Sequence, residues 1–320
     1  MSYSTLSIDV TAKVEPLLKD GRQHHISAWV FAPDTPVSVS GRPVVIFLLN
    51  GGTYDKRYFH FQVPGAKGYS TAEALQDKGY YVVLLDHLGV GESSRADNER
   101  LVTRHVAASA NHSAVEAISD KLSKGQIAGI AALGDFVKVG GGHSMGGFVS
   151  ITQQAAHKTY DGLLVLGYTA VGVHLSHAGQ VVPADQGPIR EDEPQYYLHD
   201  RSRLHESFHW DDVPDDVVAV DDGLNVEVPC TLSRQSTMMG IVTDDAAKID
   251  VPVYICLGER DVSPNAHAEP SYYTSSSDVT LHILPKSGHC QSFASTRQEM
   301  FDRIDTWIGG LKWPVHHPRT

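Results

Sequence analysis

Six short, continuous apolar runs constrain the fold of this chain more than any other feature of its sequence. They are rich in Val and Ile, they are bounded mostly by Gly, Pro, Asn or Asp, and they cover residues 44–49, 80–85, 136–139, 163–166, 253–257 and 279–284. A strand that is apolar at every position is buried on both faces, which is typical of a parallel sheet covered by helices. The runs therefore predict the strands of a central, mostly parallel sheet.

Helical patterns lie between the apolar runs. Amphipathic spacing predicts helices over residues 71–77, 113–122, 148–157 and 296–308, and Ser70 is a suitable N-cap for the first of them. Alternation of strands and helices predicts an α/β fold with helices on both faces of the sheet. The start of the chain differs, because residues 4–14 and 24–31 alternate in polarity around Asp20 and Gly21, which predicts an antiparallel hairpin at the sheet edge.

The rhythm of strands and helices stops between residues 169 and 250. This stretch is polar and rich in His, and it carries the acidic pairs at residues 211–212, 215–216 and 221–222. A structureless loop of that length is improbable in a compact domain, so we expect the stretch to form helices of its own. We therefore divide the chain into a core of residues 1–168 and 251–320 and a cap or lid insertion of residues 169–250.

Charge and cysteine content limit the classes of partner and compartment. The formal net charge of −12 repels phosphate backbones and anionic lipid, so nucleic acid and membranes are poor candidate partners. The chain starts without a basic and apolar leader, and its three cysteines show no CxxC spacing. These features favour a reducing cytoplasm. The assembly state is left open between monomer and homodimer.

Residues 142–146 read Gly-His-Ser-Met-Gly, which is a G-x-S-x-G pattern. An apolar run precedes it and a helical pattern follows, and a serine nucleophile needs this strand–turn–helix arrangement. Glycines flank the serine because side chains would collide in so sharp a turn. The turn also places the hydroxyl at a helix N-terminus, where backbone N–H groups face developing negative charge. The pattern predicts Ser144 as a nucleophile.

The general base and its acid must be chosen by position, because the chain has 18 histidines. Functional residues gather at the carboxyl ends of strands in an open parallel sheet. His289 follows the last apolar run, and Asp261 follows the run before it, which gives the order Ser, Asp, His expected on such a fold. We predict His289 as the base and Asp261 as the acid that orients it, with Glu259 as a competing acid. Cys290 has no sharp turn of its own and is predicted to be a buried thiol.

A second glycine-rich turn follows the apolar run 44–49. Residues 50–54 read Asn-Gly-Gly-Thr-Tyr, and the glycines let the backbone turn its N–H groups toward a substrate carbonyl. We expect one oxyanion donor at Gly52 or Thr53 and the other at Met145. Nearby aromatic and imidazole side chains are candidates to line the substrate pocket, although the aromatic ones serve equally well as core residues; they are Tyr54, Tyr58, Phe59 and His143.

Together these motifs resemble the α/β-hydrolase superfamily. The resemblance rests on residues 50–53, 142–147, 258–261 and 287–289 and on the D-x-x-G-x-G-x-S loop at residues 86–93, which is mainly structural in that family. It covers the frame of the chain and implies an α/β-hydrolase fold with a helical cap over the site. Asn50 stands where many relatives have a histidine that holds the loop. Serine at position 144 disfavours relatives with an aspartate nucleophile, such as dehalogenases and epoxide hydrolases.

The resemblance and the motifs predict a serine esterase or lactonase that forms an acyl-enzyme with a small-molecule carboxylic ester or lactone and needs no cofactor or metal. The same triad would serve an acyltransferase or a C–C bond hydrolase, and the motifs do not separate these activities. A zinc site is a competing interpretation, because residues 205–209 match H-E-x-x-H and Glu227 is a candidate third ligand. It is disfavoured, because residues 210–214 leave little room for the motif to continue as a regular helix. A ligand-binding receptor is disfavoured by the intact Ser–His–Asp set.

Overall fold

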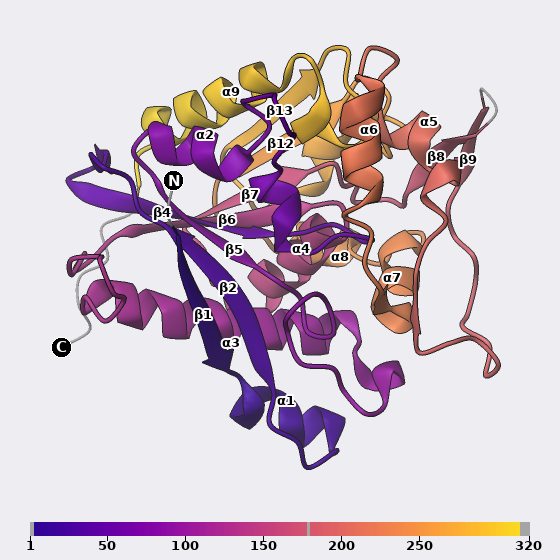
Figure 1. Ribbon diagram of the computed structural model, residues 1–320, viewed down its shortest axis with the longest axis horizontal. Coiled ribbons are helices and arrows are strands. Elements are labelled where there is room, and N and C mark those ends of the chain that lie inside the picture. Colours follow the sequence, from indigo (N-terminus) through magenta and orange to yellow (C-terminus); the bar gives the residue numbers. More distant parts are fainter. Residues whose placement is uncertain (1–2, 178–179, 314–320) are drawn as a thin grey trace.

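The computed structural model describes residues 3–177 and 180–313, and these residues form a nine-stranded sheet (Figure 1). The strands are β1 (Ser4–Asp9), β2 (His25–Phe31), β3 (Ser38–Val39), β4 (Arg42–Leu49), β5 (Tyr81–Leu85), β6 (Val137–His143), β7 (Gly162–Leu166), β12 (Val253–Gly258) and β13 (Val279–Leu284). They lie in the order β1-β2-β5-β4-β6-β7-β12-β13, and β3 pairs with β4. From β5 to β13 every neighbouring pair is parallel, as the apolar runs predicted.

Burial on both faces explains why the strands read as continuous apolar runs. Along β4, Val45, Phe47 and Leu49 pack on one side with the residues of one hydrophobic cluster. The residues between them, Ile46 and Leu48, pack on the other side in a second cluster. Successive side chains of a strand point to opposite faces, so a strand that is covered on both sides buries nearly all of them and is mostly apolar. All six apolar runs are confirmed as strands, and β13 has the predicted bounds.

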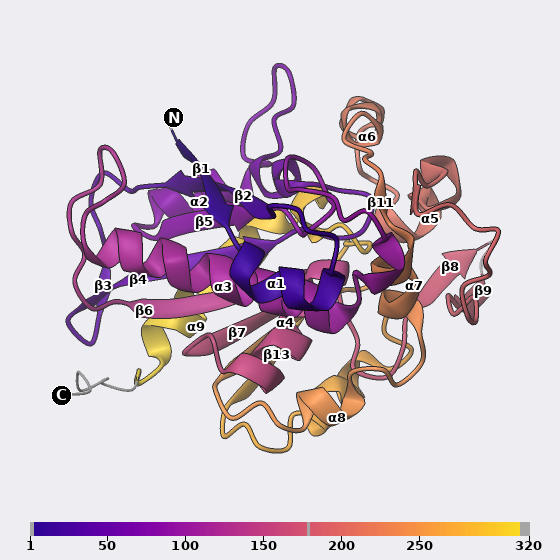
Figure 2. The same ribbon diagram turned by 90° about the horizontal axis from the view of Figure 1, so that it is seen from below.

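Helices cover both faces of the sheet, as predicted (Figures 1 and 2). One face carries α2 (Thr71–Asp77) and α9 (Arg297–Gly310), and the other carries α3 (Arg104–Ser123) and α4 (Met145–His157). The Ser70 hydroxyl accepts a hydrogen bond from the Glu73 N–H at 3.1 Å, which confirms it as the N-cap of α2. Both α3 and α4 start earlier than the predicted helices.

The predicted hairpin at the start of the chain is partly wrong. β1 and β2 do pair antiparallel at the sheet edge. Between them, however, stands the helix α1 (Thr11–Leu18) rather than a tight turn, and Figure 2 shows it beside α3. Its buried residues Val14 and Leu18 are four apart, which is helical spacing and not the alternation of a strand. The alternating pattern of β1 stops at Asp9, before this spacing begins.

The segment between β7 and β12 forms several short elements at one end of the sheet, on the right of Figure 1. Its helices are α5 (His205–Phe208), α6 (Asp215–Asp222), α7 (Cys230–Thr237) and α8 (Thr243–Ala246). Two antiparallel pairs accompany them, β8 (His174–His177) with β9 (Gln180–Pro183) and β10 (Tyr196–Tyr197) with β11 (Val228–Pro229). Helices were expected in this insertion, whereas the two strand pairs were not foreseen. Its division from the core as a separate domain stays a prediction.

Short 3₁₀ helices complete the described chain; they are Lys56–His60, Glu99–Leu101, Arg201–Arg203, Ala266–Tyr272 and Gln291–Phe293. Within residues 3–177 and 180–313, no helix is both long enough and apolar enough to cross a bilayer.

The sheet depends on a close approach of backbones at Gly141. A Cβ atom there would lie 1.9 Å from the carbonyl oxygen of Leu164 on β7, so an alanine forces the two strands apart. We expect Gly141→Ala to lower the free energy of unfolding by about 3 kcal/mol, measured by urea denaturation. Gly309→Ala is the matched control, because nothing lies within 4 Å of its Cβ position on α9. It should raise stability by about 0.5 to 1 kcal/mol, and equal effects of the two changes would contradict this reasoning.

Candidate active site

Ser144 lies in a strained turn between β6 and α4. Its φ of 54° and ψ of −118° fall in a region that residues with a Cβ rarely adopt. The Ser144 N–H donates to the Leu166 carbonyl at 2.8 Å, which ties the turn to the end of β7. Its neighbours along the chain, His143 and Met145, are buried, whereas Ser144 itself is partly exposed. The turn thus presents the serine outward from the end of the strand.

The glycines of the G-x-S-x-G pattern are required by contact with β4. A Cβ atom at Gly142 would lie 2.4 Å from the Leu49 carbonyl oxygen, and one at Gly146 would lie 2.0 Å from the same atom. Either side chain would push the turn and α4 away from β4. The two glycines therefore let the serine turn pack directly against the end of the neighbouring strand.

His289 and Asp261 form a buried pair at the carboxyl ends of β13 and β12. Nδ1 of His289 lies 2.7 Å from Oδ1 of Asp261, and the two side chains are 3% and 2% exposed. Asp261 Oδ1 also accepts from the Val262 N–H at 2.7 Å, and Oδ2 accepts from the Gly258 N–H at 2.7 Å. A carboxylate only accepts, so it holds the proton of His289 on Nδ1 and leaves Nε2 as the nitrogen able to take one up.

Gln291 is a partner of Asp261 that the sequence reasoning missed. Its side-chain amide donates to Asp261 Oδ2 at 2.6 Å, and the residue is buried. Its only signal in the sequence was its place two residues after His289. The competing acid Glu259 lies elsewhere and accepts a hydrogen bond from the Lys286 N–H at 2.9 Å.

The loop of His289 is joined directly to the serine turn. Nε2 of His143 donates to the His289 carbonyl at 2.8 Å, and the two imidazole rings are 4.6 Å apart. Burial and the neighbouring imidazole lower the pKa of His143 well below its usual value, so this side chain is neutral and serves as a fixed donor. The residue before Ser144 therefore sets where the His289 loop lies.

The glycine-rich turn after β4 meets the serine turn. A Cβ atom at Gly51 would lie 3.2 Å from Cβ of Ser144, and one at Gly52 would lie 3.9 Å from Cβ of Met145. Thr53 has a φ of 71°, which is unusual for a β-branched residue. Met145 is the first residue of α4, where backbone N–H groups lack partners within the helix and carry positive partial charge. The structure thus brings the predicted oxyanion residues together beside Ser144.

Asn50 holds this turn by hydrogen bonds to the backbone. Its side-chain amide donates to the carbonyls of Tyr54 at 2.5 Å and Gly51 at 3.1 Å. The Asn50 carbonyl in turn accepts from Nε2 of His87 at 2.8 Å, and Asn111 donates to Nδ1 of the same ring at 3.2 Å. The turn is therefore closed by an asparagine where many members of the resembled family use a histidine.

The predicted pocket residues are fully buried around the turns. Tyr58 stacks on His143 with ring centroids 4.5 Å apart, and Phe59 packs on Tyr58 at 5.0 Å. These contacts support the serine turn. Tyr54 instead reaches the insertion, where its hydroxyl accepts a hydrogen bond from Arg201 at 2.7 Å. A role of Tyr54, Tyr58, Phe59 and His143 in substrate binding stays a prediction.

Cys290 is buried, as predicted for a structural thiol. Its Sγ lies 3.2 Å from the Tyr54 hydroxyl, and burial raises its pKa well above the usual value. A thiol that stays protonated is a poor nucleophile.

The H-E-x-x-H segment is bound by carboxylates of α6. Nε2 of His205 lies 2.8 Å from Asp222, and Nε2 of His209 lies 2.9 Å from Asp221. The helix α5 ends at Phe208, so the two histidines are not on one regular helical face. Glu227 pairs with Arg95 at 2.9 Å. In the part of the chain that the structure describes, no three His, Cys, Asp or Glu side chains are grouped to hold a metal ion.

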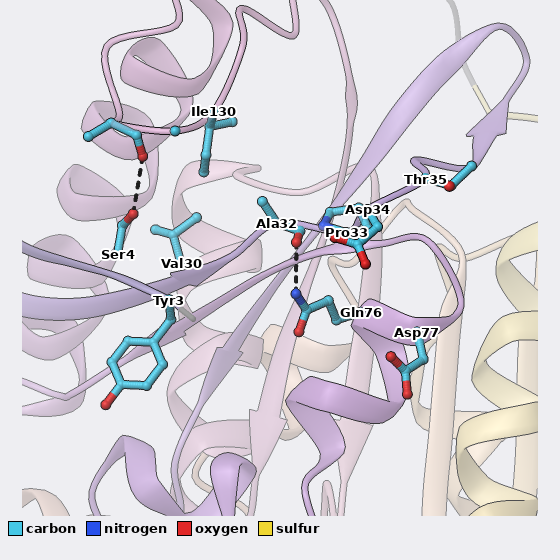
Figure 3. A pocket seen from close by; sticks show the side chains of 12 residues that line it. Tyr3, Ser4, Val30, Ala32, Pro33, Asp34, Thr35, Gln76, Asp77 and Ile130 are labelled. Carbon is cyan, nitrogen blue, oxygen red and sulfur yellow. Dashed lines mark hydrogen bonds between the residues drawn. The ribbon is translucent and has the colours of Figure 1, made fainter. Parts of the chain in front are cut away.

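The pocket drawn in Figure 3 lies away from these residues. It has a volume of about 840 Å³ and lies near the amino ends of the parallel strands, since Asp77 precedes β5 and Ile130 precedes β6. At its edges the Ser4 hydroxyl donates to the Ala128 carbonyl at 3.4 Å, and the Gln76 side-chain amide donates to the Ala32 carbonyl at 2.7 Å. A second pocket of about 660 Å³ borders Asp261, Arg260 and the hairpin of β8 and β9. The competing acid Glu259 also lines the second pocket, whereas Ser144, His289 and the residues of the oxyanion turn line neither.

Comparison with known proteins agrees with this fold. A family model described as the alpha/beta hydrolase family matches residues 46–303. The comparison with curated proteins found no match to the chain.

Several solved structures share the fold at low sequence identity. The carboxylesterase CesB from Bacillus subtilis is 12% identical, with a TM-score of 0.60, over 98% of this chain and 93% of that one. Proline iminopeptidase from Mycobacterium smegmatis is 15% identical, with a TM-score of 0.59, over 96% and 98% of the two chains. E-2-(acetamidomethylene)succinate hydrolase is 13% identical, with a TM-score of 0.58, over 96% and 99%. At these identities the likeness concerns the fold alone.

The buried imidazole of His87 makes the stability of the protein depend on pH. Burial lowers the pKa of His87 to about 4, whereas a histidine in the unfolded chain takes up its proton near pH 6.5. The unfolded state therefore binds more protons below pH 6.5, and stability falls as the pH drops from 6.5 to 4. We expect His87→Gln to remove about 3 kcal/mol of this loss, measured by urea denaturation at pH 7 and pH 4. Equal losses in the wild type and the variant would contradict the assignment.

Proposed function

The chain belongs to the alpha/beta hydrolase family, and we propose that it cleaves a small-molecule carboxylic ester or lactone through an acyl-enzyme on Ser144. One observation carries the proposal. His289 forms a buried hydrogen bond with Asp261 through Nδ1, and the loop that carries His289 is joined to the serine turn by the hydrogen bond from His143. This arrangement leaves a proton-accepting nitrogen and a nucleophilic hydroxyl on adjoining loops.

In the proposed reaction His289 Nε2 removes the proton of the Ser144 hydroxyl as Oγ attacks the substrate carbonyl. Asp261 keeps the imidazole oriented and stabilises the imidazolium that forms. The negative charge on the carbonyl oxygen is held by the backbone N–H groups of Met145 and of Gly52 or Thr53. Each such donor contributes about 3 kcal/mol to the stabilisation of the transition state.

Collapse of the tetrahedral intermediate breaks the bond to the leaving alcohol, which takes its proton from His289. Water then attacks the acyl group on Ser144 with His289 again acting as the base. The acid product leaves and the serine regains its proton. No step requires a cofactor, because the charge and the proton are handled by residues of the chain itself.

A chemical argument and a structural likeness support an ester or lactone as the substrate. An ester carbonyl is less stabilised by resonance than an amide carbonyl and is attacked more readily, so an ester suits a site of this kind. The carboxylesterase CesB, which has this fold, is one of several hydrolases with similar structures. The residues around Ser144 are buried and Ser144 is only partly exposed, which favours a small acyl group.

Three free, buried cysteines support a place in the reducing cytoplasm.

Removal of the nucleophile tests the proposal most directly. Ser144→Ala should lower kcat for a short p-nitrophenyl ester by at least about 10⁴-fold and abolish covalent labelling by a phosphonate probe. Ser271→Ala, which changes an exposed serine, should behave as the wild type. Full hydrolysis by a folded Ser144→Ala protein would overturn the proposed function.

The identity of the orienting acid is tested by a matched pair of variants. Asp261→Asn removes the charge that holds His289 in the required tautomer, so kcat/KM should fall by about 10⁴-fold. Glu259→Gln should leave kcat/KM within about twofold, because Glu259 accepts a hydrogen bond from the Lys286 backbone and not from His289. Steady-state kinetics with the same ester checks both. The reverse pattern would assign the role of the orienting acid to Glu259.

A further inference from the structure

A short stretch of the insertion is bonded to both halves of the candidate active site. The carbonyls of Ser207 and Phe208 accept hydrogen bonds from the backbone N–H groups of His289 and Cys290, at 2.8 and 2.9 Å. Six residues earlier, Nη1 of Arg201 donates to Oγ1 of Thr53 at 2.9 Å. The insertion therefore touches the loop of the base and the turn of the oxyanion donors from the same segment.

The contact with the His289 loop is a close one. A Cβ atom at Gly288 would lie 2.7 Å from the Phe208 carbonyl oxygen, so the pairing of the two segments requires a glycine there. The Phe208 ring also packs on the His289 ring, with centroids 5.2 Å apart. Backbone and side chain of the insertion thus both fix the loop that carries the base.

The contact with the oxyanion turn passes through a buried guanidinium. Arg201 Nη2 donates to the Tyr54 hydroxyl at 2.7 Å and pairs with Asp221, and the side chains of Arg201 and Asp221 are 4% and 0% exposed. The guanidinium lies over the Tyr54 ring at 4.4 Å and near the Phe208 ring at 5.4 Å. It therefore bridges α6, the oxyanion turn and α5 in one cluster.

A buried ion pair such as that of Arg201 and Asp221 adds little stability to the contact between the insertion and the core. Desolvating two charges consumes most of their attraction, and apolar residues of similar size hold an interface equally well. A guanidinium, however, fixes the positions of the groups that it binds, because its donors form a rigid planar fork. Thr53 is the residue whose conformation must be held, because its φ of 71° is strained and persists only if its surroundings fix it. The insertion holds it twice, by Arg201 on Oγ1 and by the Val226 N–H on its carbonyl at 3.0 Å.

We propose that Arg201, balanced by Asp221, is a positioning residue that fixes Thr53 and Tyr54 so that the oxyanion turn keeps its geometry beside Ser144. The inference rests on the proposed function of Ser144. It means that the insertion, and not the core alone, completes the catalytic geometry. Loss of the clamp should therefore lower kcat more than it changes KM.

The variant that tests the clamp is the double change Arg201→Met with Asp221→Asn. It removes both charges together, because either change alone leaves an uncompensated or unpaired group in the interface. We expect kcat to fall by about 10- to 100-fold while KM stays within about threefold. Arg203→Met is the matched control, since Arg203 lies on the same 3₁₀ turn but is 81% exposed, and it should retain the wild-type kcat.

A third change separates the clamp from general damage to the interface. Thr53→Val removes the hydroxyl that accepts from Arg201 and keeps the shape of the side chain, so it should lower kcat by about tenfold. Added to the double variant, it should lower kcat by less than about twofold further, because the bond is already gone. Full additivity of the two effects, or a double variant that keeps kcat within twofold of the wild type, would overturn the inference.

Hydrogen exchange provides a measurement that does not depend on activity. Amides of residues 51–54 should exchange faster in the double variant than in the wild type and in Arg203→Met, whereas unchanged exchange would overturn the clamp. If the wild type shows no hydrolysis that depends on Ser144, the proposed function fails, and the exchange measurement still decides whether Arg201 holds the turn.

Discussion

The site depends on one backbone contact, between the end of β4 and the turn that follows β6. The Leu49 carbonyl oxygen occupies space that a Cβ atom at Gly142 or Gly146 would need. Because neither residue has a side chain, the serine turn packs directly onto β4. The same contact brings Gly51 and Gly52 beside Ser144 and Met145. The oxyanion turn and the nucleophile are thus neighbours as a consequence of sheet packing, and the order of strands in the sheet determines the chemistry that can be built there.

Around this contact the protein keeps its histidines in defined states by burial and hydrogen bonds. His87 and His143 have depressed pKa values because they are buried, and each donates one ring N–H to a backbone carbonyl. His289 differs, because a carboxylate faces its Nδ1. Only a ring with such a partner is stabilised when it becomes charged during a reaction. Burial and hydrogen-bonding partners together therefore make His87 and His143 fixed donors, and the carboxylate beside His289 suits it to the proposed role of proton acceptor.

The sequence sufficed for those features that depend on local pattern. Strands buried on both faces carry few polar residues, so their runs could be identified. The structure places Ser144, Asp261 and His289 after strand ends, as predicted, and their catalytic roles stay predictions. The helix α1 was misread because its buried residues Val14 and Leu18 follow directly on an alternating strand. Contacts such as that of Arg201 with Thr53 join residues 148 positions apart and leave no local pattern. Pairings of this kind are set by how the insertion packs, which composition and periodicity do not encode.

The contacts between the insertion and the core limit how the proposed enzyme could change its substrate. In many proteins a loop that selects the ligand can vary while a rigid scaffold keeps the reacting groups in place. Here the insertion itself makes the hydrogen bonds that hold these groups, because Arg201 donates to Thr53 and the Ser207 carbonyl accepts from the His289 N–H. A change in the insertion that reshapes the pocket will therefore also move the catalytic groups unless it preserves Arg201, Asp221 and the carbonyls of Ser207 and Phe208. Variation of specificity is thus confined to the parts of the insertion that lie outside this cluster.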